Sequence, residues 1–587
     1  MRVASLLLVF IVAKAIVLAG HHLAVSWWSP IAYVWQDAAV VLVFAAAEWW
    51  LGPRQRAVWA VYAALALYVA LNIPVGRVLS TPLTWFMWRA ARGPLADSIG
   101  HYATWQNVTL CASVAAIAAV APAIFRWTPR PPVLAALVLC VMLGPAAVAR
   151  VDTLGLDRNA WTALIATAMP RMVSRASDGD WRATRFERAA SDDLSRFQGS
   201  AAGRNVVVVS LESTAAQYLG VYGAAPDVMP HLSELAESAV VFDAAYAVYP
   251  ESIKGLFSTL CSTYPAFDSA AELYADVPCR SIAAVLSGSG YRTALFHSGR
   301  FAYLGMEAIV RDRGYGTLAD AGDVGGHRNS SFGVDEASTV NAILKWIDAS
   351  PAGQRFFVTY VPIAGHHPYE TPEPGPFPDR DEFGRYRNAL HDGDRSLGTL
   401  IDGLRARGLA ERTLWIVFGD HGEAFGQHEG NYGHTFALYD ENVHVPLLVA
   451  APGLIPRQVR SREVVSLIDT APTILDLVGL GTPAMYQGRS MLDGEPRMAL
   501  FFADYSLGLL GLRDGPRKFI YELDSGRSRL FDVERDQPEK MDLSAREPDR
   551  IQWYAQHLRN WSAAQKARLS TTQRPMGLRP PLRRLPV

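Results

Sequence analysis

The sequence predicts two parts of different fold class: an N-terminal bundle of five transmembrane helices, followed by an α/β domain with a largely parallel central sheet. Half of the 587 residues are hydrophobic, and they concentrate in five long runs before residue 150. From residue 204 onward, short β-branched runs alternate with helical patterns, which is typical of an α/β domain. A chain of this length exceeds the ~100–200 residues of one ordinary domain.

Overall composition excludes several classes of protein. The chain has 55 Lys and Arg against 56 Asp and Glu, a net charge of −1, and four cysteines. A general nucleic-acid binder needs a basic face, so no nucleic-acid partner is expected. Four cysteines are too few for a disulfide-dense secreted scaffold of this length.

The N-terminal part, residues 1–150, is predicted to cross the membrane five times. Each run is close to the ~20 residues that a helix needs to span a bilayer core. A cleaved signal peptide is the alternative for the first run, but Lys14 interrupts it and four more runs follow. The runs are Val3–Gly20, Ile31–Leu51, Ala57–Val75, Val108–Phe125 and Pro132–Ala149.

Charge in the connecting loops predicts the orientation. The short loops after the second and fourth runs each hold two arginines, whereas His21–Pro30 has neither Lys nor Arg. The positive-inside bias then puts the N-terminus in the cytoplasm and everything after Arg150 outside. The outer loop Gly76–Asn107 also holds three arginines, which argues against this orientation. Its tryptophans suit an amphipathic segment in the membrane interface, and an irregular loop is the alternative.

The remaining divisions follow from composition. Residues 151–203 are predicted to be a linker, with an interfacial helix near Ala160–Val173 and a flexible tether at Ser174–Gly203. Residues 204–560 form the predicted α/β domain. Residues 561–587 contain six Lys and Arg and no acidic residue, so a basic disordered tail is expected there.

Polar side chains follow three predicted strands of the α/β domain. Glu212 ends the strand that begins at Asn205, Gly365–Tyr369 follows Phe356–Val361, and Asp420-His421 follows Thr413–Phe418. Ligands of parallel sheets sit beyond the carboxyl ends of the strands. Carboxylate and imidazole together suit Zn²⁺ or Mn²⁺, and ordinary polar loop residues are the alternative. Other predicted elements are the strands Thr293–Phe296 and Val445–Ala450 and the helices Glu336–Asp348 and Phe383–Arg407.

Several segments in order resemble the alkaline phosphatase/sulfatase superfamily, above all its membrane-bound branch of lipoteichoic acid synthases and phosphoglycerol or phosphoethanolamine transferases. The resemblance implies a sulfatase-like outer domain behind the membrane helices. It is carried by Asn205–Ser213, Phe418–Glu423, Tyr432–His434, Val465–Thr473, Gln487–Ser490 and Leu530–Lys540.

The resemblance also implies the nucleophile. Family members place it 13 residues before the Pro of a Tyr-Pro pair, here Pro265, which gives Ser252, with Thr214 and Ser258 as competing hydroxyls. Sulfatase maturation to formylglycine requires Pro or Ala two residues after the nucleophile and Arg four residues after it. Lys254 and Leu256 stand there, so Ser252 is expected to stay a plain serine, which suits a covalent phospho-enzyme.

Further roles are assigned on the same basis. Glu212, Asp420 and His421 would hold one divalent metal ion, Mn²⁺ or Zn²⁺ with Mg²⁺ as a further candidate, and Ser252 would be the fourth ligand. His366 and His434 would bind phosphate oxygens or protonate the leaving alkoxide, while the neighbouring His367 points away. Arg300 and Lys254 are candidate phosphate clamps, with a solvated surface charge as the alternative for each.

The four cysteines divide between the two parts of the chain. Cys111 and Cys140 lie in predicted membrane helices, whereas Cys261 and Cys279 lie 18 residues apart in the outer domain. A disulfide persists outside the cytoplasm, so we expect Cys261 and Cys279 to be bonded, which would stabilise the fold by ~3 kcal/mol.

These expectations combine into one predicted function. The protein would sit in the bacterial cytoplasmic (inner) membrane and move a phospho-headgroup, phosphoglycerol or phosphoethanolamine, from a phospholipid donor through Ser252 to an envelope glycan or lipid acceptor. The nearest alternative is a membrane-anchored hydrolase, either a phosphodiesterase or a sulfatase. A non-catalytic binding protein is the third alternative, against which the intact site residues argue.

Overall fold

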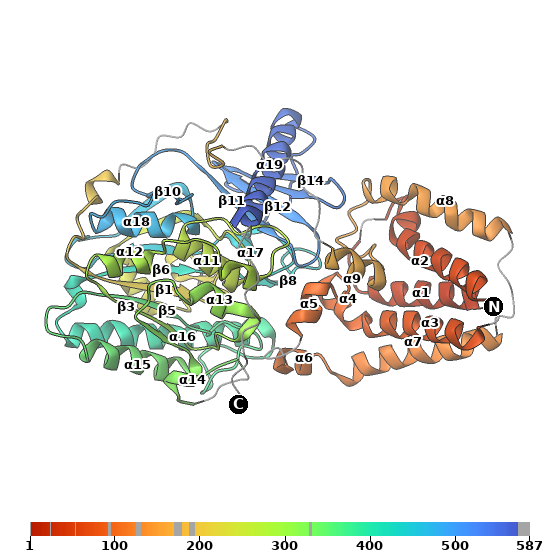
Figure 1. Cartoon of the computed structure of the whole chain (residues 1–587), viewed down its shortest axis with the longest axis horizontal. Coiled ribbons are helices and arrows are strands. Elements are labelled where there is room, and N and C mark those ends of the chain that lie inside the picture. Colours follow the sequence, from red (N-terminus) through yellow and green to blue (C-terminus); the bar gives the residue numbers. More distant parts are fainter. Residues whose placement is uncertain are drawn as a thin grey trace.

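The computed structural model describes residues 2–23, 25–52, 54–91, 96–124, 131–169, 179–186, 194–327 and 332–572. The described chain forms a helical part up to residue 169 and an outer domain from residue 194, which lie side by side (Figure 1).

Apolar helices account for most of the helical part. Four spans are long and apolar enough to cross a membrane: α2, the pair α3–α4 over Gln55–Leu79, α7 and α8. The first predicted run forms α1, but its 17 residues are fewer than the ~20 that a bilayer core requires. Four of the five predicted crossings are therefore supported. The helices are α1 (Arg2–Leu18), α2 (Ser29–Leu51), α3 (Gln55–Leu71), α4 (Ile73–Leu79), α5 (Trp85–Ala90), α6 (Ala96–His101), α7 (Trp105–Ile124), α8 (Pro131–Val148) and α9 (Ala160–Ala168).

Lys14, the charge that interrupts the first run, is buried and holds helices together. Its Nζ lies 3.6 Å from Asp37 Oδ2 on α2 and donates at 2.9 Å to the carbonyl oxygens of Leu156 and Arg158. A buried charge persists only when it is paired and hydrogen-bonded. The loop after α8 is thus anchored between α1 and α2.

The loop predicted at Gly76–Asn107 and the linker both contain short helices. The loop contains the end of α4 and the whole of α5 and α6. Trp85 and Trp88 on α5 are partly exposed. In the linker, α9 occupies the first part of the predicted interfacial helix. Residues 170–178 and 187–193, on which much of the predicted tether falls, lie outside the described residues.

A sheet in the order β10-β2-β9-β6-β1-β5-β3-β4 is the centre of the outer domain. All its neighbouring strands run parallel except β9, which is antiparallel to β2 and β6. The predicted, largely parallel sheet is confirmed. Its strands are β1 (Asn205–Leu211), β2 (Ala239–Tyr246), β3 (Arg292–His297), β4 (Thr317–Ala319), β5 (Phe356–Val361), β6 (Thr413–Gly419), β9 (Leu447–Ala450) and β10 (Val459–Ser466).

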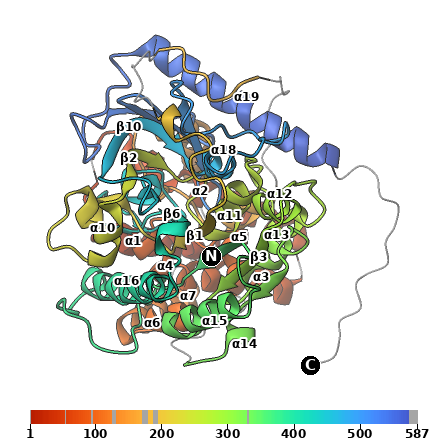
Figure 2. The same cartoon turned by 90° about the vertical axis from the view of Figure 1, so that its left-hand side faces the viewer.

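Helices cover both faces of this sheet, because alternate residues of a strand point to opposite faces. Val206 and Val208 of β1 pack in the core beneath α11, α12, α13 and α18, whereas Val207 and Val209 pack in the core with α10, α15 and α16. Figures 1 and 2 show these two helix layers on opposite sides of the strands. The helices are α10 (Pro230–Ala236), α11 (Ser252–Cys261), α12 (Ile282–Gly288), α13 (Met306–Val310), α14 (Ala321–Val324), α15 (Glu336–Asp348), α16 (Glu382–Ala406), α17 (Asp440–Val443) and α18 (Thr470–Leu477).

A smaller antiparallel sheet follows, in the order β11-β12-β13-β14, and α19 packs on it (Figure 1). α19 runs from Pro548 to Thr572, so the tail predicted from residue 561 is helical for its first twelve residues. Trp561 explains the difference, because it is fully buried against the smaller sheet. Residues 573–587 lie outside the described residues. The strands are β11 (Met498–Ala503), β12 (Leu509–Asp514), β13 (Arg517–Glu522) and β14 (Ser528–Asp532), with β7 (Ala424–Phe425) and β8 (Tyr432–Gly433) forming a separate ribbon.

Polar contacts fasten the outer domain to the helical part. Ser506 donates to Thr81 at 2.6 Å and accepts from Arg158 at 3.2 Å, and Arg527 and Arg529 both pair with Asp152. The loop after β5 and the loop between β7 and β8 also reach the helical part: the His367 ring stacks on Tyr102, and His21 Nδ1 lies 2.9 Å from Glu429 Oε1. The carboxyl edge of the sheet therefore faces the helices.

Candidate metal centre

Two neighbouring strands of the sheet end in acidic residues. β1 pairs with β6 in parallel, with Leu211 opposite Gly419, so Glu212 and Asp420 leave the sheet side by side. Ser213 N and His421 N both donate to Asp420 Oδ1, at 3.0 and 2.8 Å. Strand register thus brings together residues that are more than two hundred positions apart in the sequence.

Three ligand atoms converge at this point. One atom each of Glu212, Asp420 and His421 lies within 4.8 Å of the other two, and all three residues are buried. His421 Nε2 is 3.6 Å from both Glu212 Oε1 and Asp420 Oδ2. Of the described residues, this group is the one that unites the predicted metal ligands.

Ser252 completes the group. It is the first residue of α11, whose N-terminus is capped by the Glu251 side chain accepting from the backbone of Ile253 at 3.1 Å. Its Oγ donates to Glu212 Oε2 at 2.9 Å and lies 3.4 Å from His421 Nε2. The N-terminus of a helix also favours a bound phosphate.

The two competing hydroxyls are occupied elsewhere. Thr214 Oγ1 donates to the carbonyl of Glu212 at 2.9 Å, and Ser258 Oγ donates to the carbonyl of Gly255 at 2.7 Å. Both are fully buried. Of the three hydroxyls that the sequence offered, only Ser252 contacts the carboxylates of the centre.

The two buried carboxylates of the centre, Glu212 and Asp420, would be stabilised by a bound cation. Burial, followed by the negative charge of Glu212, raises the pKa of Asp420 well above its usual value. Burial also acts to raise the pKa of Glu212, but the nearby histidines outweigh it and leave that pKa lowered. Two carboxylates held together away from water repel each other, and a divalent ion removes that cost. The residues present therefore fit a metal ion.

His434 lies beside the centre and pairs with a carboxylate of its own. Its ring is 4.2 Å from the His421 ring, and its Nδ1 is 2.6 Å from Glu423 Oε2. Although burial acts to lower it, the Glu423 carboxylate raises the pKa of His434 to about 9. Tyr369 donates to the other oxygen of Glu423 at 2.6 Å, which fixes the carboxylate.

Glu423 is a further site residue, for which no role was predicted from the sequence. The signal was present, because Phe418–Glu423 is one continuous segment after β6. A second unassigned residue is His297, at the end of β3 on the same edge of the sheet. Its Nδ1 lies 2.9 Å from the carbonyl of Val361, and burial lowers its pKa, although the nearby Glu212 acts against that change.

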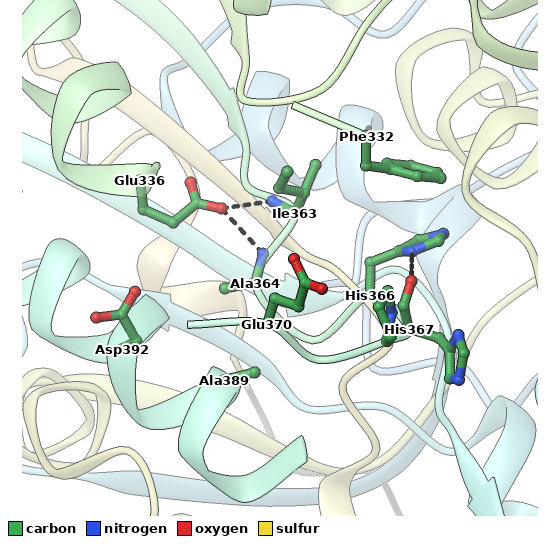
Figure 3. Close-up of a pocket in the computed structure, with 10 residues that line it drawn as sticks. Phe332, Glu336, Ile363, Ala364, His366, His367, Glu370, Ala389 and Asp392 are labelled. Carbon is green, nitrogen blue, oxygen red and sulfur yellow. Dashed lines mark hydrogen bonds between the residues drawn. The ribbon is translucent and has the colours of Figure 1, made fainter. Parts of the chain in front are cut away.

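The adjacent histidines after β5 point in different directions. Figure 3 shows the His366 ring against Phe332, with ring centroids 3.6 Å apart, and the His367 ring away from it. Burial lowers the pKa of His366, although the nearby Glu212 acts to raise it. Gly365 makes this turn with φ of +102°, where a Cβ would lie 2.5 Å from the carbonyl oxygen of Glu212.

Lys254 differs from both sequence-based interpretations. It is buried, and its Nζ lies 2.9 and 3.1 Å from the two carboxylate oxygens of Asp504, just beyond β11. It is therefore neither a solvated charge nor a free phosphate clamp, and the sequence could not reveal a partner 250 residues away. Arg300 lies 3.6 Å from Asp320 and its side chain is half exposed, as in the surface-charge alternative.

Cys261 and Cys279 form a disulfide with Cα atoms 5.6 Å apart. The bond joins the last residue of α11 to the segment that leads into α12. It therefore restrains the far end of the helix that presents Ser252.

Comparison with known proteins finds a family model that matches most of the outer domain. The model of the Sulfatase family matches residues 204–480. The lipoteichoic acid synthase-like protein YvgJ of Bacillus subtilis is 25% identical over 325 residues, which is 52% of this chain and 52% of that protein. Bovine arylsulfatase K is 38% identical over 105 residues, 18% of this chain and 19% of that protein. The chain thus spans about half the length of the first of these relatives and much less of the second.

Solved structures agree on the fold. A protein of the alkaline phosphatase superfamily from Vibrio parahaemolyticus superposes with a TM-score of 0.53 at 20% identity, covering 64% of this chain and 90% of that one. The lipoteichoic acid synthase LtaP from Listeria monocytogenes gives 0.51 at 18% identity, covering 64% and 94%. The outer domain therefore has the α/β fold of that superfamily.

Proposed function

We propose, from the sulfatase-family domain at residues 204–480, that this protein transfers a phospho-headgroup from a membrane phospholipid to an envelope glycan or lipid. The headgroup is phosphoglycerol or phosphoethanolamine. The similarity to a lipoteichoic acid synthase-like protein favours phosphoryl transfer over sulfate chemistry. The four apolar helices support an enzyme that works where its donor lipid lies.

We propose that α1 makes a fifth crossing, so that the outer domain is extracytoplasmic in a bacterial cytoplasmic membrane. Residues 1–150 are then the membrane part, 151–203 the connection and 204–560 the catalytic domain. The buried Lys14–Asp37 pair supports this arrangement, because it fixes α1 against α2 within one bundle.

The proposed metal ligands are Glu212, Asp420 and His421, with Ser252 Oγ beside them. Bound Mn²⁺ or Zn²⁺ would lower the pKa of the serine hydroxyl and screen the phosphate oxygens. A carboxylate and imidazole set suits either ion.

In the first step Ser252 Oγ attacks phosphorus, and the bond from phosphorus to the oxygen of diacylglycerol breaks. Glu212, whose Oε2 lies 2.9 Å from Ser252 Oγ and accepts its hydrogen bond, takes up the hydroxyl proton as the oxygen attacks. The departing alkoxide takes a proton from His434, whose ion pair with Glu423 keeps it protonated. The products are diacylglycerol and a phosphodiester on Ser252.

In the second step an acceptor hydroxyl attacks the same phosphorus. His434, now neutral, removes the proton of the acceptor as the bond to Ser252 breaks, and Glu212 returns its proton to Ser252 Oγ, which restores the serine hydroxyl. His366, neutral and close to Glu212, is positioned to hold a phosphate oxygen. One headgroup has moved, and the residues have returned to their starting protonation.

The observation that carries this proposal is the hydrogen bond of Ser252 to Glu212 at the N-terminus of α11. Purified protein should release diacylglycerol from labelled phosphatidylglycerol or phosphatidylethanolamine with Mn²⁺ or Zn²⁺, and mass spectrometry should find the headgroup on the Ser252 peptide. Ser252→Ala should abolish both signals. Ser258→Ala, which removes a hydroxyl from the same helix, is the control; equal release by Ser252→Ala and wild type would refute the proposal.

A membrane-anchored hydrolase is the second candidate, and the 38% identity to arylsulfatase K over 105 residues favours it. Water would then replace the acceptor hydroxyl. Formylglycine at position 252 would identify a sulfatase, whereas a phosphodiester on an unmodified serine that persists until a hydroxyl acceptor is added would identify a transferase.

A further inference from the structure

A second group of metal-ligating side chains lies where the helical part meets the outer domain. His101 ends α6, His367 belongs to the loop after β5, and Glu382 begins α16. One ligand atom of each lies within 4.8 Å of the other two. His101 Nε2 is 3.4 Å, and His367 Nε2 is 4.0 Å, from the same oxygen, Glu382 Oε1.

We propose that His101, His367 and Glu382 bind a divalent transition-metal ion at this junction, with Zn²⁺ the best match. Two imidazoles and one carboxylate form a known set of three protein ligands for zinc, which leaves a fourth position for water. Imidazole nitrogen also disfavours Mg²⁺ and Ca²⁺, which prefer oxygen ligands. The partly exposed side chains leave a route by which an ion can enter.

Neighbouring aromatic residues orient these ligands. The Tyr102 ring stacks on the His367 ring, with centroids 5.8 Å apart and planes 9° from parallel, and its hydroxyl donates to Glu382 Oε1 at 3.4 Å. The Tyr369 ring meets His367 edge-on at 5.2 Å. Such outer contacts hold metal ligands in position before the ion binds.

A simple ion pair explains less of this geometry. An exposed pair of His101 and Glu382 would contribute little to stability and would need no third ligand. His367 nevertheless presents its Nε2 to the same carboxylate from a different element. Convergence of three donors from three separate segments is what a metal ion requires.

The position of the site gives it a consequence. His367 follows His366 directly, so an ion at the junction would tie the loop that carries His366 to α6 of the helical part. The inference is independent of the proposed function, because it concerns binding at a different group of residues and holds equally for a transferase or a hydrolase.

Binding can be tested on the full chain in detergent micelles after removal of metal with a chelator. A Glu212→Ala/His421→Ala background disables the candidate metal centre, so that Co²⁺ absorption and elemental zinc analysis report the junction. We expect one equivalent of metal in this background and at least a tenfold weaker affinity after His101→Ala or Glu382→Gln. His22→Ala and Glu370→Ala, exposed residues outside the group, are the controls and should bind as the background does.

A second measurement uses the otherwise unaltered chain. Zn²⁺ should slow hydrogen exchange in the peptide containing residues 99–102, and Glu382→Gln should remove this protection. Unchanged metal content in both junction variants, or equal exchange with and without Zn²⁺, would overturn the proposal.

Discussion

Among the carboxylates that raise the pKa of His434, Glu423 acts most strongly, and Glu212 and Asp420 act in the same direction. Replacing Glu423 with Gln removes the carboxylate that raises the pKa of His434, so less of the imidazole is protonated at neutral pH. We expect kcat to fall ~10²-fold or more, as for loss of a general acid. The pH at which activity declines on the alkaline side should also move down, because the proton is lost more easily.

The matched measurement is metal content, which should remain that of the wild type, since Glu423 is not among the proposed ligands. Loss of metal together with activity would instead make Glu423 a ligand of the centre, in line with its place beside His421 and His434.

Asp394 allows a test of stability against pH. It is buried and accepts from the backbone of His231 at 2.8 Å and Leu232 at 2.9 Å, at the start of α10. Burial raises its pKa from 3.8 to about 6, so the folded protein binds a proton that the unfolded chain releases between these values. Stability should therefore fall as the pH rises from about 4 to about 6, by up to ~3 kcal/mol.

Asp394→Asn cannot titrate and keeps one acceptor oxygen for the helix. Its unfolding temperature, measured between pH 4 and pH 6, should fall less steeply than that of the wild type. Parallel curves for the two proteins would show that Asp394 titrates at its ordinary value.

At the residue scale, the site was predictable where strand ends could be located. Glu212, Asp420 and His421 follow apolar runs directly, so the edge on which they meet followed from the parallel sheet. The pairing of Lys254 was not predictable, because its partner Asp504 comes from the segment that follows β11. His297 directly follows a predicted strand, yet no sequence pattern separates it from an ordinary core histidine.

At the element scale, α11 is held at its start by the buried Lys254–Asp504 pair. Asp504 also accepts from Tyr249 Oη and, at 2.8 Å, from Asp268 N. Asp504→Asn would leave the Lys254 ammonium buried without a counter-ion, which costs ~3–5 kcal/mol. We expect a clear fall in the unfolding temperature of the outer domain, measured by calorimetry.

The matched control is the exposed ion pair between Glu307, on α13, and Arg311, which directly follows that helix. Glu307→Gln removes the same kind of charge at the surface, where such pairs contribute ~0–1 kcal/mol. If the two substitutions shift the unfolding temperature equally, the buried pair does not stabilise α11 in the way described.

The elements that the sequence revealed are those with a strong apolar pattern. β5 and α15 have the predicted bounds, and α16 differs by one residue at each end. α19 was missed because its residues are mostly polar, although Tyr554, Leu558 and Trp561 are spaced as one helix face and are buried. The antiparallel direction of β9 depends on strand pairing far along the chain, which local pattern does not encode.

At the scale of the whole molecule, the centre faces the helical part. A chain that begins at residue 194 should keep the metal centre, since all its proposed ligands lie beyond that point. We expect it to cleave a soluble phosphodiester within a few-fold of the full-length rate. Release of diacylglycerol from phospholipid vesicles should fall at least tenfold, because the contacts that fasten the outer domain to the apolar helices are gone.

The control is the full chain assayed on both substrates under the same conditions. Equal loss on the soluble and the vesicle substrates would mean that the helical part supports the fold of the centre rather than its access to lipid.

The fastening of Ser506 to Thr81 and of Arg527 and Arg529 to Asp152 has a kinetic consequence. A catalytic centre held at a constant distance from the membrane would meet its donor lipid by lateral diffusion, in two dimensions. Diluting the donor with inert lipid, at constant total donor in the tube, should therefore slow turnover in proportion to its surface density. The density of donor lipid within the leaflet, and not the amount of lipid in the sample, would determine the turnover rate of such an enzyme.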